Sequence, residues 1–374
     1  MTPAELSRTV LRSVRGAVEA RELVLAEGAL PERVEVAPPP HDGCGDYATN
    51  VALRLAKDVG VPPREVAGVV AKRLARVPGI AAVDVAGPGF LNITLGGDAP
   101  AALVREVLAA GRAYGRRGRL PEAASPGADP TSPVALRPAP VDLRPAPGPR
   151  AAAVADALRA IMEAAGEGTR PGGEAVRPVP VKDATGEYVT AEELLARLGR
   201  DETRWVLLYP AAHDHVRVPE RPVQREGNPR FLVQYAYART CAVLRNAHDL
   251  GVLPAGVDEA AAEQAVVALT GAGAATGPVD DGATVPYTPL HAALAAYPAA
   301  LEAAARLRAP DRLARQLEVT ADAVLRFLAS CPPLPAGEQK PMAVHRARLA
   351  VAQAAGTVLA NGLTLLGVSA PEHL

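Results

Sequence analysis

The chain has 374 residues, of which 49% are apolar, and this length predicts two or three domains with buried cores. The formal net charge of −1 excludes a strong overall attraction to nucleic acids, so any binding of RNA has to depend on local basic patches. The three cysteines are far apart and form no CxxC pair, which argues against a disulfide framework or a zinc site and fits a cytoplasmic protein.

Residues 1–115 predict a compact α+β domain. Apolar residues from Leu6 to Leu25 recur at helical spacing, which predicts a first helix of about six turns. This amphipathic start is unlike a signal peptide, and no run approaches the roughly 18 apolar residues of a membrane span, so no membrane contact is predicted. The further elements are a short strand in "PERVEVAPPP", helices in "NVALRLAKDVG" and "VPPREVAGVVAKRLARV", two strands around the Gly-Pro-Gly turn of "IAAVDVAGPGFLNITL", and a helix in "APAALVREVLAAGRAYG".

Residues 116–149 are dense in proline, a composition that cannot hold a helix and predicts an extended linker. Residues 150–225 then predict only fragments of an α/β domain. They include a helix in "AAAVADALRAIMEAAG" and a second helix that Thr190 caps, with Glu193 three residues further on. The stretch "RWVLLYP" predicts a buried strand or a short helix. His213 and His215 form a local pair without further ligand spacing, so no metal site is predicted.

Residues 226–374 predict an all-α bundle, because one helical pattern follows another with breaks at glycine-rich and proline-rich stretches. The first of these helices begins in "NPRFLVQYAYARTCAVLRNA". Asn228 can cap it, and Pro229 occupies the favoured first helical position.

This helix has two contrasting faces. The face predicted to pack carries Phe231, Tyr235, Ala238 and Ala242. The opposite face is predicted to point outward, where it would offer rings, amides and positive charge to unstacked RNA bases and phosphates; it carries Arg230, Gln234, Tyr237, Cys241 and Arg245. The alternative is an ordinary surface helix whose tyrosines are half-buried.

The same segment closely resembles the start of the anticodon-binding domain of arginyl-tRNA synthetases, a DALR-type helical bundle. The resemblance continues through "LHAALAAYPAALEAAARLRAPDRLARQLEVTADAVLRFLASC" to "HRARLAVAQAAGTVLANGLTLLGVSAPEHL". Members of that family usually end in Glu-Arg-Met, whereas His373 and Leu374 stand in the last two places here. The resemblance implies that the residues on or near the anticodon face are Gln234, Tyr235, Tyr237, Arg239 and Arg346.

The N-terminal domain resembles the same family in "GDYATNVALRLAK" and "VAGPGFLNITL". In that family the aromatic residue and the asparagine of a Gly-aromatic-x-Asn motif read a base of the tRNA D-loop, and Phe90 and Asn92 occupy these positions. An aromatic face can stack on a flipped base while an amide bonds its edge. The alternative is that Phe90 belongs to the core and Asn92 caps a turn.

The two nucleotide-binding signatures of a class I synthetase are not matched. Alignment with the helix after the His-x-Gly-His signature places its four positions on residues from Pro145 to Gly148, which contain no histidine. The Lys-Met-Ser-Lys positions fall on residues from Pro180 to Asp183, and an aspartate replaces the last lysine, which would repel ATP phosphates. Only about twenty residues separate these remnants, whereas a Rossmann-type catalytic domain needs well over a hundred.

We therefore predict an α+β N-terminal domain, a remnant α/β middle segment and a C-terminal helical bundle of the DALR anticodon-binding type. The predicted function is tRNA binding without catalytic residues and without ATP or another cofactor. Two alternatives remain open at this point. One is an active arginine–tRNA ligase, and the other is a regulator that binds a synthetase or another protein through its helices.

Overall fold

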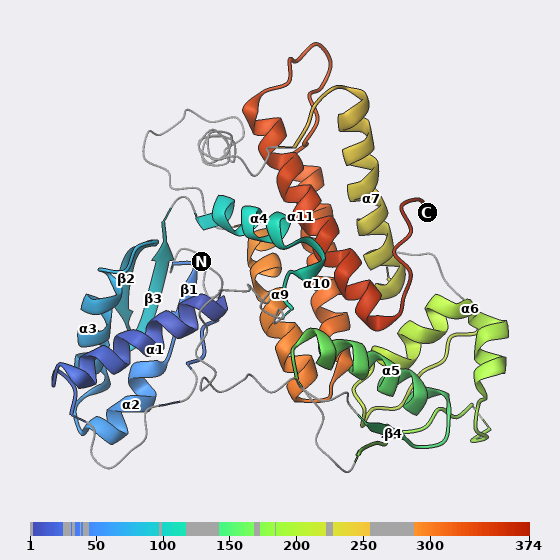
Figure 1. Cartoon of the computed structure of the whole chain (residues 1–374), viewed down its shortest axis with the longest axis horizontal. Helices are drawn as coiled ribbons and strands as arrows, with labels where there is room; N and C mark the ends of the chain where they lie inside the picture. The colour runs from blue at the N-terminus through green and yellow to red at the C-terminus, as the bar shows by residue number, and fades with distance from the viewer. Residues whose placement is uncertain are drawn as a thin grey trace, which may run out of the picture. The chain divides into compact units, whose positions relative to one another are not determined.

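The computed structural model shown in Figure 1 divides the chain into two units. In its described part the first unit holds the residues up to Glu106 together with 288–296 and 342–347, and the second unit holds the rest. The proline-rich stretch 117–141 and the glycine-rich break at 270–287 lie outside the described residues. Described are residues 3–24, 31, 34–37, 39, 45–96, 99–116, 142–167, 173–183, 185–221, 227–254 and 288–374.

The first unit packs helices against one face of a small antiparallel sheet, whose strand order is β1-β3-β2. Leucine, valine and isoleucine side chains from the helices and from the inner face of the sheet form its core. The elements are α1 (Pro3–Glu19), β1 (Tyr47–Thr49), α2 (Val51–Val59), α3 (Pro63–Leu74), β2 (Ile80–Ala86), β3 (Phe90–Leu95) and the first part of α4 (Ala99–Ala110). Helix α4 passes into the second unit after Glu106 and ends in a 3₁₀ turn at Gly111–Ala113.

Two local predictions for this unit need correction. The first helix ends at Glu19, short of the six turns predicted, because the chain turns back at Arg21, whose φ of 57° is left-handed. Strand β1 was not predicted, and the described residues of "PERVEVAPPP" contribute an isolated bridge between Ala37 and Ala48 in place of the expected strand. The other predicted helices and the β2–β3 hairpin are confirmed, and α2 ends at Gly60 as expected.

The second unit begins with a β-α-β arrangement made of β4 (Leu143–Pro145), α5 (Pro149–Ala164) and β5 (Glu174–Val176). The two strands pair in parallel, as a crossover through a helix requires. Strand β4 and the first residue of α5 lie at the end of the segment predicted as a linker. The described part of the middle segment therefore starts with one crossover unit, whose strands have three residues each.

Helix α6 (Ala191–Leu208) follows and includes most of the stretch "RWVLLYP". Its predicted cap is confirmed, because Glu193 N–H donates to Thr190 Oγ1 at 3.2 Å and Thr190 N–H donates to Glu193 Oε2 at 2.8 Å. Gly199 interrupts the helix with a φ of 73°, a conformation that favours glycine.

Within its described residues, the C-terminal part consists of four long helices, in line with the predicted bundle: α7 (Pro229–Asp249), α9 (Pro289–Arg306), α10 (Pro310–Ser330) and α11 (Ala343–Leu366). Helix α7 packs on α10, and glycine allows α7 to lie close to α11, since a Cβ on Gly356 would stand 2.8 Å from Thr240 Oγ1. Residues 344–366 of α11 are long and apolar enough to cross a membrane, contrary to the sequence analysis, but they are mostly buried within the protein, as in the core helix of a helical bundle.

Candidate nucleic-acid interface

The outer face of β3 carries the two residues that the sequence assigned to RNA. Alternate residues of a strand point to opposite faces, and burial along β3 follows this rule. Leu91 and Ile93 are fully buried, whereas Phe90 keeps 40% of its surface exposed and Asn92 is half-buried. The alternative in which Phe90 belongs to the core is therefore wrong.

Small residues surround Phe90 and Asn92 on this face, which we call the β3 platform. Antiparallel pairing sets Phe90 beside Ala86, and it sets Asn92 between Asp84 and Ala48. Directly paired residues point to the same side of a sheet, so methyl groups leave the phenyl ring accessible. The platform offers a stacking surface next to an amide and a carboxylate, which are the groups that can bond the edge of a base.

A positive charge lies at the turn that precedes the platform. The exposed Arg64 at the start of α3 donates from Nη1 to the carbonyl oxygen of Gly87 at 3.3 Å, in the turn between β2 and β3. The sequence analysis missed Arg64, because this contact joins residues 23 positions apart and has no local signal. A guanidinium at this place can meet the phosphate of a base that stacks on Phe90.

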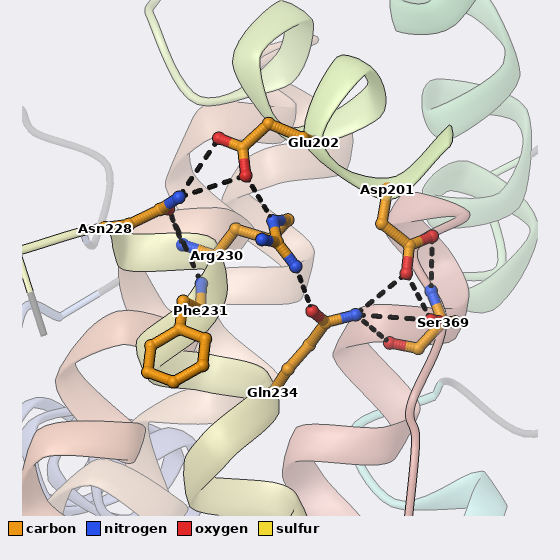
Figure 2. A network of polar contacts seen from close by, with 7 residues as sticks. All are labelled: Asp201, Glu202, Asn228, Arg230, Phe231, Gln234 and Ser369. Atoms are coloured by element: carbon orange, nitrogen blue, oxygen red, sulfur yellow. Dashed lines mark hydrogen bonds and ion pairs between the residues drawn. The ribbon is translucent and has the colours of Figure 1, made fainter. Parts of the chain in front are cut away.

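The start of α7 is fixed by a network of polar side chains, shown in Figure 2. Asn228 caps the helix as predicted, since its Oδ1 accepts from the N–H of Arg230 at 3.0 Å. Its Nδ2 donates to the carboxylate of Glu202 on α6, and Arg230 Nε donates to the same carboxylate at 2.5 Å. Arg230 also donates to Gln234 Oε1, so the charges of this buried pair are compensated.

Gln234 extends this network to the C-terminal tail, residues 367–374. Its Nε2 donates to Asp201 Oδ2 at 2.8 Å and to the carbonyl oxygen of Ser369 at 3.0 Å. The side chain of Ser369 also donates to Asp201. Burial alone would raise the pKa of Asp201, but the hydrogen bonds from Ser369 and Gln234 outweigh it and hold this pKa below its ordinary value.

These contacts bury part of the face of α7 that was predicted to point outward. Arg230 and Gln234 were expected to point outward, but both are buried, and Gln234 exposes only 2% of its surface. The physical reason is that α6 and the C-terminal tail supply polar partners for this side of the helix. Tyr237 on the same side is half-buried, and burial together with the neighbouring Cys241 raises its pKa to about 12, so it stays protonated.

The side of α7 that was expected to pack is partly exposed, although Ala238 on that side is buried as predicted. Phe231, Tyr235 and Arg239 are spaced four residues apart and form what we call the α7 stripe. The rings of Phe231 and Tyr235 stack with their centroids 5.8 Å apart, Tyr235 is 38% exposed, and Arg239 is exposed. Two of the predicted RNA-contacting residues, Tyr235 and Arg239, are thus accessible together.

The last residues of the chain lie along the opposite side of α7. Arg245 donates to the carbonyl oxygen of Glu372 at 3.3 Å and lies 3.3 Å from His373 Nδ1. Leu374, which stands where the related family has methionine, is exposed. The predicted residue Arg346 is exposed near the start of α11 and belongs to the first unit, so it is described separately from the α7 stripe.

The positions aligned with the first nucleotide signature form the connection between β4 and α5. Pro145 ends β4, and Gly148 precedes α5 with φ 116° and ψ 157°, a conformation that favours glycine. The next residue but one, Arg150, is 1% exposed, and its guanidinium donates to five backbone carbonyl oxygens at 2.7–3.3 Å; these belong to Val179, Leu207, Pro210, Ala211 and Asp214. Sequence reasoning aligned this arginine but could not find its partners.

The positions aligned with the second signature form a closed turn after Pro180. Asp183 accepts hydrogen bonds from the backbone and hydroxyl of Thr185 at 2.8 and 2.7 Å and from the backbone of Glu187 at 3.0 Å. The Thr185 hydroxyl is the main cause that lowers the pKa of this carboxyl group. Lys182 lies over the ring of Tyr188, with 4.9 Å between Nζ and the ring centroid. Both charged side chains are thus engaged within their own turn.

Two family models match the ends of the chain. The model of the arginyl tRNA synthetase N terminal domain matches residues 8–95, and the model of the DALR anticodon binding domain matches residues 286–374. The β3 platform lies inside the first match and α11 with the C-terminal tail inside the second.

Curated relatives and solved structures point the same way. The arginine–tRNA ligase of Kineococcus radiotolerans is 47% identical over 140 residues, which are 36% of this chain and 25% of the relative. That of Micrococcus luteus is 51% identical over 122 residues, 32% of this chain and 22% of the relative. The chain thus matches about a quarter of the length of these relatives.

The arginyl-tRNA synthetases of Thermus thermophilus and Plasmodium falciparum both give a TM-score of 0.60, at 15% and 8% identity. Both comparisons cover all of this chain, with 100% and 99% of the other chain, and at this identity they show the fold alone. Taken with the two family models and the curated relatives, they show that the chain is an arginyl-tRNA synthetase-related protein that corresponds to only part of the full-length enzyme.

Proposed function

We propose that this protein binds tRNA without charging it. The observation that carries the proposal is the contrast between the ends and the middle of the chain. The ends match the N-terminal and anticodon-binding domains of the family, whereas the described residues of the middle form one short β-α-β unit followed by α6. The accessible RNA-facing groups are Phe90 and Asn92 on the β3 platform and Tyr235 and Arg239 on the α7 stripe.

The chemistry of these two surfaces suits folded RNA with unpaired loops. Aromatic rings stack on splayed bases, amides bond base edges, and arginine contacts phosphate. Gln234 is assigned a supporting role, because its amide anchors the C-terminal tail to α7 and is not accessible. Tyr237 on α7 and Arg346 on α11 remain proposed RNA contacts.

The residues of the middle segment support our proposal that this chain does not activate an amino acid. The signature positions from Pro145 to Gly148 end a strand and lead into α5, and Asp183 brings negative charge to the position where the family uses lysine. Adenylation needs fixed positive groups around the leaving pyrophosphate. The proposal therefore assigns no catalytic residue and no ATP to this chain.

Electrophoretic mobility shift with unfractionated tRNA tests the binding half of the proposal. We expect a dissociation constant in the micromolar range or below at low salt, which rises steeply as salt is added, because phosphate contacts release counterions. No shift at low salt would refute tRNA binding. A partner protein captured from cell extract after nuclease treatment, in the absence of any shift, would favour a protein-binding regulator.

Arginine-dependent exchange of pyrophosphate into ATP tests the other half. We expect no exchange above background from the purified chain, with a full-length arginyl-tRNA synthetase as the positive control. Robust exchange would show that the chain is an active arginine–tRNA ligase and would overturn our alignment of the signature positions.

A further inference from the structure

A groove of about 950 Å³ lies within the second unit, and its lining residues differ from those of the α7 stripe. Its walls come from the end of α6, the segment 210–221, the residues that lead into α7, and one side chain of α10. The lining residues that matter for its chemistry are Trp205, Tyr209, His215, Arg217, Arg221 and Arg315.

One wall of the groove is aromatic. Trp205 and Tyr209 stack with their ring centroids 5.9 Å apart and an angle of 22° between the planes. Trp205 is 3% exposed, and its indole N–H is a buried donor without a hydrogen-bond partner among the described residues. Tyr209 donates to Glu318 at 2.6 Å, which fixes its ring at the wall of the groove. A buried donor without a partner is costly, so this wall is suited to an occupant with acceptor atoms.

The net charge left in the groove is positive. Glu202 is neutralised by Arg230, and the carboxylate of Asp214 lies 3.6 Å from His213. Arg217 and Arg221 are exposed and have no ion-pair partner in the described part of the chain.

Arg315 on α10 adds to this charge. Its guanidinium carbon lies 5.9 Å from the centroid of the Tyr209 ring, and its Nε lies 3.8 Å from a carboxylate oxygen of Asp311. Three guanidinium groups therefore surround a stacked aromatic pair.

We propose that this groove binds a short unpaired stretch of RNA. Guanidinium groups would meet its phosphates, while the wall of Tyr209 and Trp205 would take up a base and its acceptor atoms. The groove adjoins Pro229, the first residue of α7, so it extends the RNA-binding surface of that helix. The inference rests on the proposed function, because the RNA strand in question belongs to the bound tRNA.

An acidic peptide is the competing occupant, since it too would be attracted by the arginines. The unpartnered indole donor and the stacked rings favour RNA. Its bases supply flat π-faces for stacking and acceptor atoms for the buried indole N–H.

The groove contains the only tryptophan of the chain, so intrinsic tryptophan fluorescence reports on this site alone. The wild-type chain would be titrated with a mixed-sequence RNA pentanucleotide, with unfractionated tRNA and, separately, with poly-glutamate. We expect saturable changes in Trp205 fluorescence with both RNAs and none with poly-glutamate. A change with poly-glutamate but not with RNA would overturn the proposal in favour of an acidic protein partner.

The double variant Arg217→Gln and Arg221→Gln removes the positive charges of the two unpaired arginines. It is expected to leave the fold intact, because both residues lie in an exposed segment. Pentanucleotide binding should weaken roughly tenfold. The slope of log K against log salt should become shallower by about 1.4, at about 0.7 for each single-strand phosphate contact. Arg200→Gln, which removes an exposed arginine of α6 outside the groove, is the matched control and should change neither quantity.

The two proposals fail separately in this experiment. If tRNA shifts the protein in a gel while neither Trp205 fluorescence nor the double variant responds, the groove inference is wrong and the proposed function stands. If the pentanucleotide binds in the groove but tRNA does not bind, the groove is a nucleotide site and the proposed function is wrong.

Discussion

At the scale of single residues, Arg150 is the most consequential side chain of the second unit. Its guanidinium is buried and donates to five carbonyl oxygens, one from residue 179 and four from the stretch 207–214. We expect Arg150→Met to lower the free energy of unfolding by about 3 kcal/mol or more, since buried acceptors would lose their donor. Urea denaturation followed by circular dichroism would measure this.

The exposed Arg200 provides a matched control for that measurement. Arg200→Met should change the free energy of unfolding by no more than about 0.5 kcal/mol. Arg150→Lys is also informative, because a lysine has three donors and cannot replace a planar guanidinium that serves five acceptors. An Arg150→Met variant as stable as wild type would mean that the five contacts are not formed in solution.

A second prediction at this scale concerns Asp201 and pH. Hydrogen bonds hold its pKa below the ordinary value of 3.8, so the folded protein binds this proton less readily than the unfolded chain. The contribution of the Asp201 carboxylate to the free energy of unfolding is therefore fully present when the pH is above that ordinary value. It is lost as pH falls through the lowered pKa of the folded state. Asp201→Asn should reduce stability at pH 7, and its difference from wild type should vanish in strong acid.

Unfolding by urea at a series of pH values between 7 and 2 would test this prediction. Asp249→Asn serves as a control, because that carboxylate lies on the exposed end of α7. A difference between wild type and Asp201→Asn that stays constant over the whole series would show that the carboxylate does not hold the C-terminal tail through Ser369.

At the scale of the elements, the six-residue strand β3 has one face proposed to bind tRNA and another face that contributes to the stability of the core. Phe90→Ala should weaken tRNA binding by roughly five- to a hundredfold, the range expected for a lost stack on a base, with little change in stability. Leu91→Ala on the buried face should instead cost about 2–5 kcal/mol of stability. Mobility shifts would measure tRNA binding, and urea denaturation would measure stability, for both variants. If neither variant lost affinity for tRNA, the β3 platform would not be part of the RNA-binding surface.

The elements also show how far sequence reasoning extends. Local signals predicted the helix caps correctly, as with Thr190 and Asn228, because a cap depends on residues within one turn. The outward face of α7 was predicted wrongly, because its partners are distant along the chain. Gln234 and Ser369 are 135 positions apart, and nothing in a helical period reveals a tail that supplies polar partners to a polar face.

Strand β1 illustrates the same limit in the first unit. Three residues are too few for an alternating pattern to be recognised, and β1 exists because β3 offers it an edge to pair with. Phe90 and Asn92, in contrast, were found through the resemblance to a family motif, and the alternation of side chains along β3 accounts for the face on which they lie.

At the scale of the whole molecule, the β3 platform and the α7 stripe belong to different units, and the proposed function gives them one ligand. When both contact the same tRNA, the second contact is intramolecular and multiplies the affinity of the first. We expect one tRNA per chain by sedimentation velocity. Phe90→Ala and Tyr235→Ala should each weaken this 1:1 complex without changing its stoichiometry, and the double variant should retain only salt-sensitive, non-specific binding. Two tRNA molecules per chain, with one lost in each single variant, would show instead that the two surfaces act independently.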